Sequence, residues 1–154
     1  MRPSEKVLLK SKKSPQKHFM KKIRPQCGLI IENAEKEILL QLRDDKPDLE
    51  YPNCWGTFGG QIEEGETPQE ALVREIKEEL DFDVESPELY RVYSFDGYDI
   101  YMFSKVNKKI TLNDFDVREG QRAGFFSREA ATRIPCAFNC RKIVEDYFRR
   151  GAVR

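Results

Sequence analysis

The sequence has few of the residues on which common metal and disulfide sites depend. Its 154 residues include one histidine, His18, and four cysteines that form no C-x-x-C pair. This scarcity argues against a zinc site, because structural zinc is held by clustered Cys and His side chains. We therefore expect free thiols in a reducing compartment, and we predict a cytoplasmic protein.

Long apolar runs are also missing. No stretch approaches the roughly 18–20 consecutive apolar residues of a membrane-spanning helix, and the N-terminus lacks the apolar segment of a secretory signal. Hydrophobic residues make up 39% of the chain and charged residues 35%, a balance typical of soluble globular proteins. We therefore expect no membrane partner. The length of the chain suits one domain with one core.

Neither sign of charge is in excess, since 27 Lys and Arg balance 27 Asp and Glu. Residues 1–24 nevertheless hold nine bases and one acid, which leaves the rest of the chain acidic. We predict a basic, mobile tail over residues 1–24, with a short strand at 7–9, and a folded domain over residues 25–154. A solubilising tail is favoured over an arm for RNA or an anionic surface, so we do not expect a nucleic-acid partner.

The apolar pattern predicts both strands and helices. Continuous or alternating apolar runs predict strands at 27–31, 37–43, 54–58, 88–95, 98–106 and 123–126. The polar segment 44–53, which contains two prolines, is predicted to be a loop. Residues 138–150 are predicted to form a terminal helix. Strands before and after a central helix predict an α+β sandwich.

The central helix is predicted within residues 59–82, after a glycine pair and an acidic loop. Thr67 is a suitable N-cap, Pro68 suits the first helical position, and Glu70 completes a capping box. The residues predicted to face the core are Leu72, Val73, Ile76 and Leu80. Ala71 is expected on the acidic side, where its small side chain leaves room for a cation.

Three glutamates, Glu75, Glu78 and Glu79, share one face of this helix because residues three and four apart are neighbours. Carboxylates this close raise one another's pKa values, which a bound cation relieves. Oxygen ligands favour Mg²⁺ or Mn²⁺, which commonly bridge to phosphates. Arg74, one turn before Glu78, is placed to pair with it. The alternative is a solvated acidic face, as most charge runs are.

These residues resemble the signature of the Nudix hydrolase family. That signature reads G, five residues, E, seven residues, R-E, an apolar residue, any residue, E-E, any residue, G and an apolar residue. The positions that match in this sequence are Gly60, Glu66, Arg74, Glu75, Glu78 and Glu79. Asp81 stands where the family usually has glycine. Aspartate tolerates the left-handed conformation of a helix end, so we expect this departure to affect stability rather than catalysis.

The resemblance implies a Nudix-type α/β/α sandwich with a mixed central sheet. It also implies metal-dependent cleavage of a nucleoside diphosphate linked to another group. The metal ligands that it implies in the box are Gly59 through its carbonyl, Glu75, Glu78 and Glu79. Glu75 is also expected to activate a water, directly or through a metal. Arg74 is expected to orient Glu75, while Gly60 and Glu66 support the loop.

Two further segments resemble the MutT branch, which cleanses the nucleotide pool. Residues 119–127 are similar to its E-G-Q and aromatic-then-Ser segment, which implies that Glu119 is a metal ligand or base. The alternative is a solvated loop glutamate. Residues 135–139 loosely resemble its P-P-A-N segment, which implies that Asn139 reads a purine edge. Alternatively, Asn139 caps the terminal helix. Phe58 is the other candidate for contact with the substrate.

The leading prediction is a MutT-like pyrophosphohydrolase that uses Mg²⁺ or Mn²⁺. Its substrate would be a nucleoside triphosphate, with oxidised purine deoxynucleotides as candidates, and its products a monophosphate and pyrophosphate. One alternative is hydrolysis of dinucleoside polyphosphates, nucleotide sugars or ADP-ribose. Tyr98 lies near the position at which some dinucleoside polyphosphate hydrolases carry a tyrosine, and the lack of a proline in that neighbourhood counts against ADP-ribose. Another is a non-catalytic nucleotide- or RNA-binding module, which the complete set of box glutamates disfavours. Both a monomer and a homodimer remain open.

Overall fold

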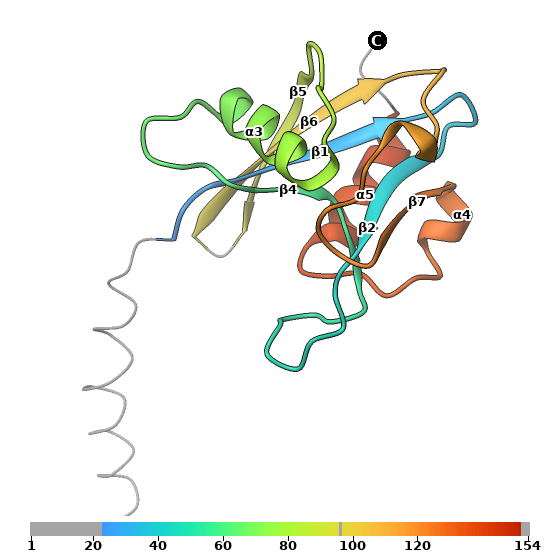
Figure 1. Ribbon diagram of the computed structural model, residues 1–154, viewed down its shortest axis with the longest axis horizontal. Helices are drawn as coiled ribbons and strands as arrows, with labels where there is room; N and C mark the ends of the chain where they lie inside the picture. Colours follow the sequence, from blue (N-terminus) through green and yellow to red (C-terminus); the bar gives the residue numbers. More distant parts are fainter. Residues whose placement is uncertain (1–22, 96, 152–154) are drawn as a thin grey trace, which may run out of the picture.

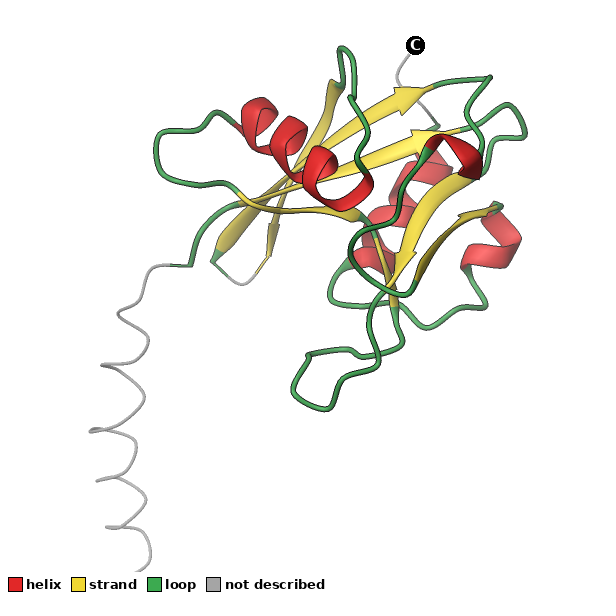
Figure 2. Cartoon of the chain, in the orientation of Figure 1, coloured by secondary structure: helices red, strands yellow, loops and turns green. Residues whose placement is uncertain are grey.

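The computed structural model describes residues 23–95 and 97–151. The strand predicted at 7–9 and most of the predicted basic tail lie outside the described residues. The elements run in the order β1 Gln26–Glu32, β2 Ile38–Leu42, β3 Trp55–Gly56, β4 Phe58–Gln61, α3 Pro68–Leu80, β5 Glu88–Phe95, β6 Tyr98–Val106, the 3₁₀ turn η1 Leu112–Asp114, β7 Arg122–Phe126, α4 Arg128–Ala131 and α5 Cys140–Arg150 (Figures 1 and 2).

The strands form one mixed sheet with β1 near its centre. β1 pairs in parallel with β6 along its whole length. On its other edge, β1 pairs antiparallel with β4 over its first half and meets β2 only at its last residue, Glu32. β2 pairs antiparallel with β3 and β7, and β5 closes the far edge as a hairpin with β6. The edge of β1 opposite β6 is therefore divided between β4 and β2.

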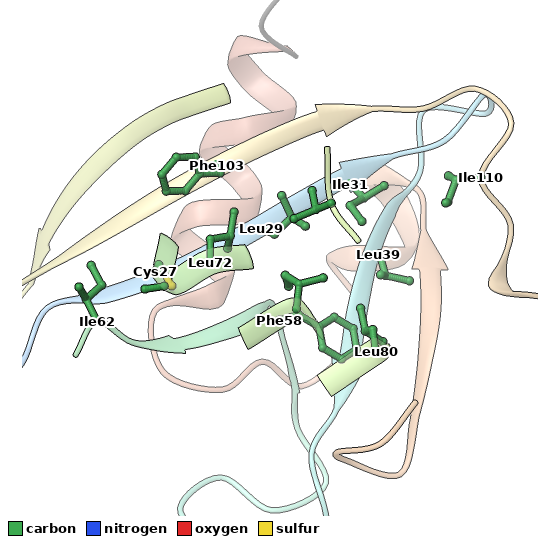
Figure 3. Packing of buried hydrophobic residues seen from close by; sticks show 13 residues of the cluster. Cys27, Leu29, Ile31, Leu39, Phe58, Ile62, Leu72, Leu80, Phe103 and Ile110 are labelled. Carbon is green, nitrogen blue, oxygen red and sulfur yellow. The ribbon is translucent and has the colours of Figure 1, made fainter. Parts of the chain in front are cut away.

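Alternate residues of β1 contribute to two hydrophobic clusters on opposite faces of the sheet. Leu29 and Ile31 pack in the cluster that holds Leu72, Ile76 and Leu80 of α3 (Figure 3). Ile30 packs in the other cluster, with residues of α5 that include Ile143, Val144 and Tyr147. Fully burying one such side chain stabilises a fold by about 1.5–3 kcal/mol. The predicted α/β/α sandwich with a mixed sheet is confirmed.

The predicted strand over residues 54–58 is divided at Thr57. The Trp55 N–H donates to the Pro135 carbonyl at 2.8 Å, and the Ala137 N–H donates to the Trp55 carbonyl at 2.8 Å. β3 thus pairs with the segment before α5, whereas β4 pairs with β1. The division matters for function, because it brings the 135–139 segment next to the glycine pair of β4.

Two further expectations need correction. The terminal helix begins at Cys140 rather than at Phe138, because Phe138 has a left-handed backbone with φ 50°. On α3, Val73 is 39% exposed, and the fully buried Ala71 takes its place in the core. Ala71 therefore does not line the acidic side of the helix. Within the described ranges, no helix is long and apolar enough to cross a membrane.

Candidate active site

Two glycines set how closely β4 approaches its neighbours. Gly59 has φ 150°, and a Cβ atom there would lie 2.0 Å from the Cys27 carbonyl oxygen of β1. A Cβ atom at Gly60 would lie 2.5 Å from the carboxylate of Glu75 on α3. Neither position accepts a side chain without displacing backbone or the carboxylate. The glycine pair therefore brings the β4 backbone against the acidic face of α3.

Helix α3 is fixed at both ends. The Thr67 hydroxyl accepts a hydrogen bond from the Glu70 N–H at 3.1 Å, and the Glu70 carboxylate accepts one from the Thr67 N–H at 2.9 Å. At the other end, Asp81 adopts φ 48° and ψ 41°, and its N–H donates to the Lys77 carbonyl. The predicted capping box and the left-handed Asp81 are both present, so the helix presents its glutamates in a fixed register.

Arg74 ties the acidic loop to the helix. Its Nε and Nη2 donate to the Glu66 carboxylate at 2.7 and 2.9 Å, and its Nη1 donates to Glu75 at 3.0 Å. These hydrogen bonds lower the pKa of Glu66 to about 2 and raise the pKa of Arg74, so both groups are charged at neutral pH. Glu78, with a side chain 60% exposed, lies 3.5 Å away. The predicted pair of Arg74 with Glu78 is therefore present, and the shorter contacts of Arg74 are with Glu66 and Glu75.

Glu79 is the most deeply buried carboxylate on this face, at 5% exposed. Its Oε1 accepts a hydrogen bond from the Gly59 N–H at 2.9 Å. Burial raises the pKa of Glu79 to about 9, and the adjacent Glu119 carboxylate adds to this effect, while the Gly59 N–H opposes it. Glu79 is buried and the neighbouring Glu119 is exposed, and two carboxylates this close favour sharing either a proton or a cation.

Glu119 reaches Glu79 because its loop is attached to both α3 and β2. The Arg118 N–H donates to the Glu79 carbonyl at 2.8 Å, and the Gln121 N–H donates to the Leu42 carbonyl at 2.8 Å. The side chain of Gln41 donates to the Glu119 carbonyl at 2.9 Å. The loop is therefore held on both sides of Glu119, an exposed residue that lies next to Glu79.

Glu75, Glu79 and Glu119 form one electrostatically coupled group, with Glu78 at its exposed edge. Burial raises the pKa of Glu75, Arg74 opposes the shift, and the charges of Glu78 and Glu119 add to it. This all-oxygen donor set fits a hard divalent cation, which would stabilise the ionised carboxylates. Among the described residues, no three such side chains converge as ligands of one ion.

Two of these carboxylates, Glu79 and Glu119, line a cavity of about 540 Å³, within the range of roughly 300–1,000 Å³ that is usual for small-molecule sites. Gly59, Gly60, Glu79 and Glu119 form one part of its lining. The residues that line the rest include Arg43, Tyr98, Ala137, Phe138, Asn139 and Cys140. The cavity therefore combines an acidic wall with a wall of aromatic and amide groups.

A family model described as "NUDIX domain" matches residues 22–147. The chain belongs to the Nudix family. It is 32% identical over 153 residues to the ADP-ribose pyrophosphatase of Methanocaldococcus jannaschii, a match that covers 90% of this chain and 85% of that protein. It is 43% identical over 61 residues to the 8-oxo-dGTP diphosphatase of Escherichia coli K12, covering 40% of this chain and 45% of that protein.

Among solved structures, one from a study of MutT from Aliivibrio salmonicida and Vibrio cholerae superposes with a TM-score of 0.70. The match has 22% sequence identity and covers 84% of this chain and all of that one, so it shows a shared fold. Family membership makes the chain a hydrolase of phosphoric anhydride bonds, and Nudix hydrolases generally need divalent metal ions.

In this Nudix fold, Asn139 lies in the cavity wall. It occupies the position before α5 but makes no capping hydrogen bond with its side chain. The Nδ2 atom lies 3.5 Å from the Tyr98 hydroxyl. Asn139 is therefore the N-cap residue of α5 by position, but its side chain forms no capping hydrogen bond, and its amide is placed where a ligand can meet it.

Phe58 does not line the cavity of this Nudix site. Its side chain is 1% exposed and lies in the core beside Leu29 and Leu80 (Figure 3). The prediction that Phe58 contacts the substrate is wrong, because alternation along β4 turns its ring toward α3 while Thr57 and Gly59 line the cavity.

Sequence analysis missed an aromatic pair beside the cavity, which we call the aromatic rim and define as Tyr51 and Phe138. Their rings lie 4.7 Å apart, and their exposed fractions are 45% and 50%. Arg43 lies over the Phe138 ring at 5.0 Å and donates to the Glu50 carbonyl at 2.7 Å. Both aromatic residues have left-handed backbones, a strain that clusters at ligand sites. Aromatics within two polar segments were the available signal.

Proposed function

We propose that this Nudix hydrolase is a MutT-like pyrophosphohydrolase that converts a nucleoside triphosphate to a monophosphate and pyrophosphate. Purine deoxynucleotides, including oxidised ones, are the first candidates. One observation supports this most: a single cavity has Glu79 and Glu119 in one wall and Asn139 and Phe138 in another. Metal-binding chemistry for phosphates and recognition chemistry for a base thus occur within the reach of one nucleotide.

On the acidic side, the chain's residues hold the reacting groups in place. The Gly59 carbonyl and the four glutamates of the site would hold Mg²⁺ or Mn²⁺, which would supply a water of lowered pKa and neutralise phosphate charge. Glu75 accepts the proton of the attacking water. Arg74, at 3.0 Å, fixes the orientation of Glu75, and the Gly59 N–H fixes Glu79.

On the other side, Asn139 and the aromatic rim recognise the base. An amide offers a donor and an acceptor to a purine edge. The exposed faces of Tyr51 and Phe138 offer a stacking surface, and stacking on an aromatic side chain is worth about 1–3 kcal/mol per base. Because the Asn139 side chain forms no capping hydrogen bond, its hydrogen-bonding capacity is available to the ligand.

ADP-ribose is a second candidate substrate. The relative named as an ADP-ribose pyrophosphatase is matched over 90% of this chain, whereas the 8-oxo-dGTP diphosphatase is matched over 40%. Cleavage between its two phosphates would release AMP and ribose 5-phosphate. The same carboxylates would act, so the two candidates differ only in what occupies the rest of the cavity.

The test measures kcat/KM with Mg²⁺ for dGTP, 8-oxo-dGTP, ADP-ribose and a dinucleoside polyphosphate. We expect the highest value with a purine triphosphate, with pyrophosphate as product. Glu75→Gln should lower kcat by about 10²–10⁴-fold, the usual contribution of a general base. Glu88→Gln, at an exposed position on β5, is the matched control and should retain full activity.

Chelation of metal should abolish turnover, and added Mg²⁺ or Mn²⁺ should restore it. A higher kcat/KM for ADP-ribose would favour the second candidate over the first. Nucleotide or RNA binding without metal-dependent turnover of any substrate would contradict both, and would identify a non-catalytic module.

A further inference from the structure

Two thiols flank the segment that carries Phe138 and Asn139. Cys136 precedes this segment and is partly exposed, while Cys140 follows it, is 6% exposed and lines the cavity. Both are free cysteines, four positions apart in the sequence, and the Cys136 thiol donates a hydrogen bond to the Ile134 carbonyl at 3.7 Å. A disulfide between them would close a small ring around residues 137–139.

Both thiols are attached to ordered elements. Cys136 lies opposite Trp55 of β3 in a parallel bridge, and Cys140 is the first residue of α5. The Cys140 N–H donates to the Ala137 carbonyl at 3.0 Å. Arg141 donates to the Ile134 carbonyl at 2.5 Å, which holds its guanidinium beside Cys136. The backbone on both sides of residues 137–139 is therefore held by the fold, which keeps the two thiols at the ends of one short turn.

The two thiols differ in reactivity. Interaction with the Cys140 side chain lowers the pKa of Cys136 to about 7; burial opposes this shift, and the charge of Arg141 supports it. The same interaction, together with burial, raises the pKa of Cys140. By contrast, burial raises the pKa of Cys27 to about 11. Since the thiolate is the nucleophile, the partly exposed Cys136 is the thiol suited to attack.

We propose that Cys136 and Cys140 form an oxidation site at which a hydroperoxide converts the thiol pair to a disulfide. The Cys136 thiolate attacks one peroxide oxygen, so an S–O bond forms, the O–O bond breaks, and the peroxide is reduced as the sulfur is oxidised to sulfenic acid. The Cys140 thiol then displaces hydroxide from the Cys136 sulfur, forming the S–S bond and releasing water. Two thiols and one hydrogen peroxide give one disulfide and two waters.

The disulfide would alter the cavity wall. Its S–S bond of about 2.05 Å is much shorter than a hydrogen-bonded contact between sulfur atoms, so the ends of the 137–139 segment must approach each other. Phe138 and Asn139 would be displaced from their positions in the cavity. Loss of one hydrogen bond to a ligand corresponds to a rise in KM of about 3–10-fold. The carboxylates lie on other elements, so kcat should remain unchanged.

The direct test is a peptide map of the full chain after treatment with one equivalent of hydrogen peroxide. Trypsin releases residues 134–141, between Arg133 and Arg141, as one peptide with both thiols. We expect this peptide to lose two hydrogens, with reversal by dithiothreitol, while Cys54 remains free to alkylation. If Cys54 is oxidised first, or both thiols in the peptide persist, the proposal is wrong.

Variants separate the two steps. In Cys140→Ser, peroxide should leave Cys136 as a sulfenic acid that a 1,3-dicarbonyl reagent traps. Cys136→Ser should show neither product and should retain the KM of the reduced protein after peroxide treatment. Cys54→Ser, the matched control, should still form the disulfide. Trapping at Cys140 instead of Cys136 would overturn the assigned order of attack.

This inference does not depend on which nucleotide is hydrolysed. The peptide map reads the disulfide directly, and failure of every substrate in the panel would leave that result intact. Conversely, normal turnover with no disulfide would refute the oxidation site and leave the proposed function unaffected. A disulfide that forms without any change in KM would overturn the proposed effect on the cavity.

Discussion

Two phenylalanines close to the cavity have opposite environments. Phe58 is 1% exposed in the core below α3, whereas Phe138 is 50% exposed in the aromatic rim. The sequence predicts Phe58 in a short strand and Phe138 in a helix, and neither assignment tells which ring is buried. Their contacts indicate that Phe58 stabilises the fold and that Phe138 contacts the ligand.

Phe58→Ala should therefore lower the free energy of unfolding by about 3–5 kcal/mol, the usual cost of removing a buried aromatic ring. Phe138→Ala should change it by less than about 0.5 kcal/mol, as most exposed substitutions do. Urea unfolding measures both values. Phe138→Ala should instead raise the KM for the nucleotide by about 5–150-fold, which corresponds to one base stacked on the ring. Equal destabilisation by the two variants would contradict this assignment.

Asp81 shows how one residue terminates the central helix. Its left-handed backbone is a conformation that glycine adopts without cost. It also forms ion pairs with Lys77 at 3.1 Å and Arg118 at 3.0 Å. A comparison of Asp81→Gly with Asp81→Ala removes these ion pairs from both variants and leaves only the backbone effect.

We expect Asp81→Gly to be about 1–2 kcal/mol more stable than Asp81→Ala in urea unfolding, because a Cβ atom disfavours the left-handed region. The kcat of the two variants should be equal, since Asp81 lies past the glutamates. If alanine were as stable as glycine there, the strain attributed to this helix end would be absent.

At the scale of elements, Asp146 connects α5 to the edge strand β5. Its carboxylate accepts a hydrogen bond from the Tyr93 hydroxyl at 2.5 Å and from Arg150 Nε at 2.8 Å. It also pairs with Arg149 of the same helix and lies 3.8 Å from Arg91 of β5. Burial alone would raise the pKa of Asp146, but these partners lower it below 3.8 overall.

This shift predicts how stability depends on pH. A folded-state pKa below the unfolded value means that the unfolded chain binds the proton more tightly. The stabilisation is therefore complete above about pH 4 and is lost as the pH falls through the folded-state value. Asp146→Asn should cost about 1.5–3 kcal/mol at pH 7, and this difference should shrink below pH 4. Urea unfolding at both pH values measures it, and a difference that is constant with pH would contradict the prediction.

At the scale of the molecule, the site is assembled from separate parts of the chain. The glycine pair comes from β4, the box glutamates from α3, Glu119 from the loop before β7, and Asn139 from the segment before α5. The sheet holds these parts together, because β4 pairs with β1 and β7 pairs with β2. The described residues, 23–95 and 97–151, supply both hydrophobic clusters and the lining of the cavity.

Deletion of residues 1–22 should therefore preserve turnover of small nucleotides. We expect kcat/KM within about twofold of the full chain and a change in unfolding free energy below about 0.5 kcal/mol, as for changes remote from a core. Substitution of the lysines in the tail by glutamine in the full chain is a matched control for charge alone. Loss of turnover on deletion would show that the basic tail contributes to the site.

The sequence alone determined the features that depend on neighbours in the chain. The capping box at Thr67, the left-handed Asp81 and the β5–β6 hairpin follow from local hydrogen bonding and residue preference, so they were predictable. The spacing of the box glutamates also placed them on one helix face. Long-range packing decided which residues of α3 are buried. Apolar and acidic residues lie side by side on this helix, so the helical period of the apolar residues does not locate the centre of the buried face.

Only the tertiary structure showed that Ala71 rather than Val73 is buried, that Arg74 binds Glu66 and Glu75, and that Phe58 is in the core. It also brought Glu119 beside Glu79 and Asn139 into the same cavity. These contacts depend on strand register and on hydrogen bonds between distant loops. Such interactions leave no local pattern in a sequence, because each partner is compatible with many others until the fold selects one.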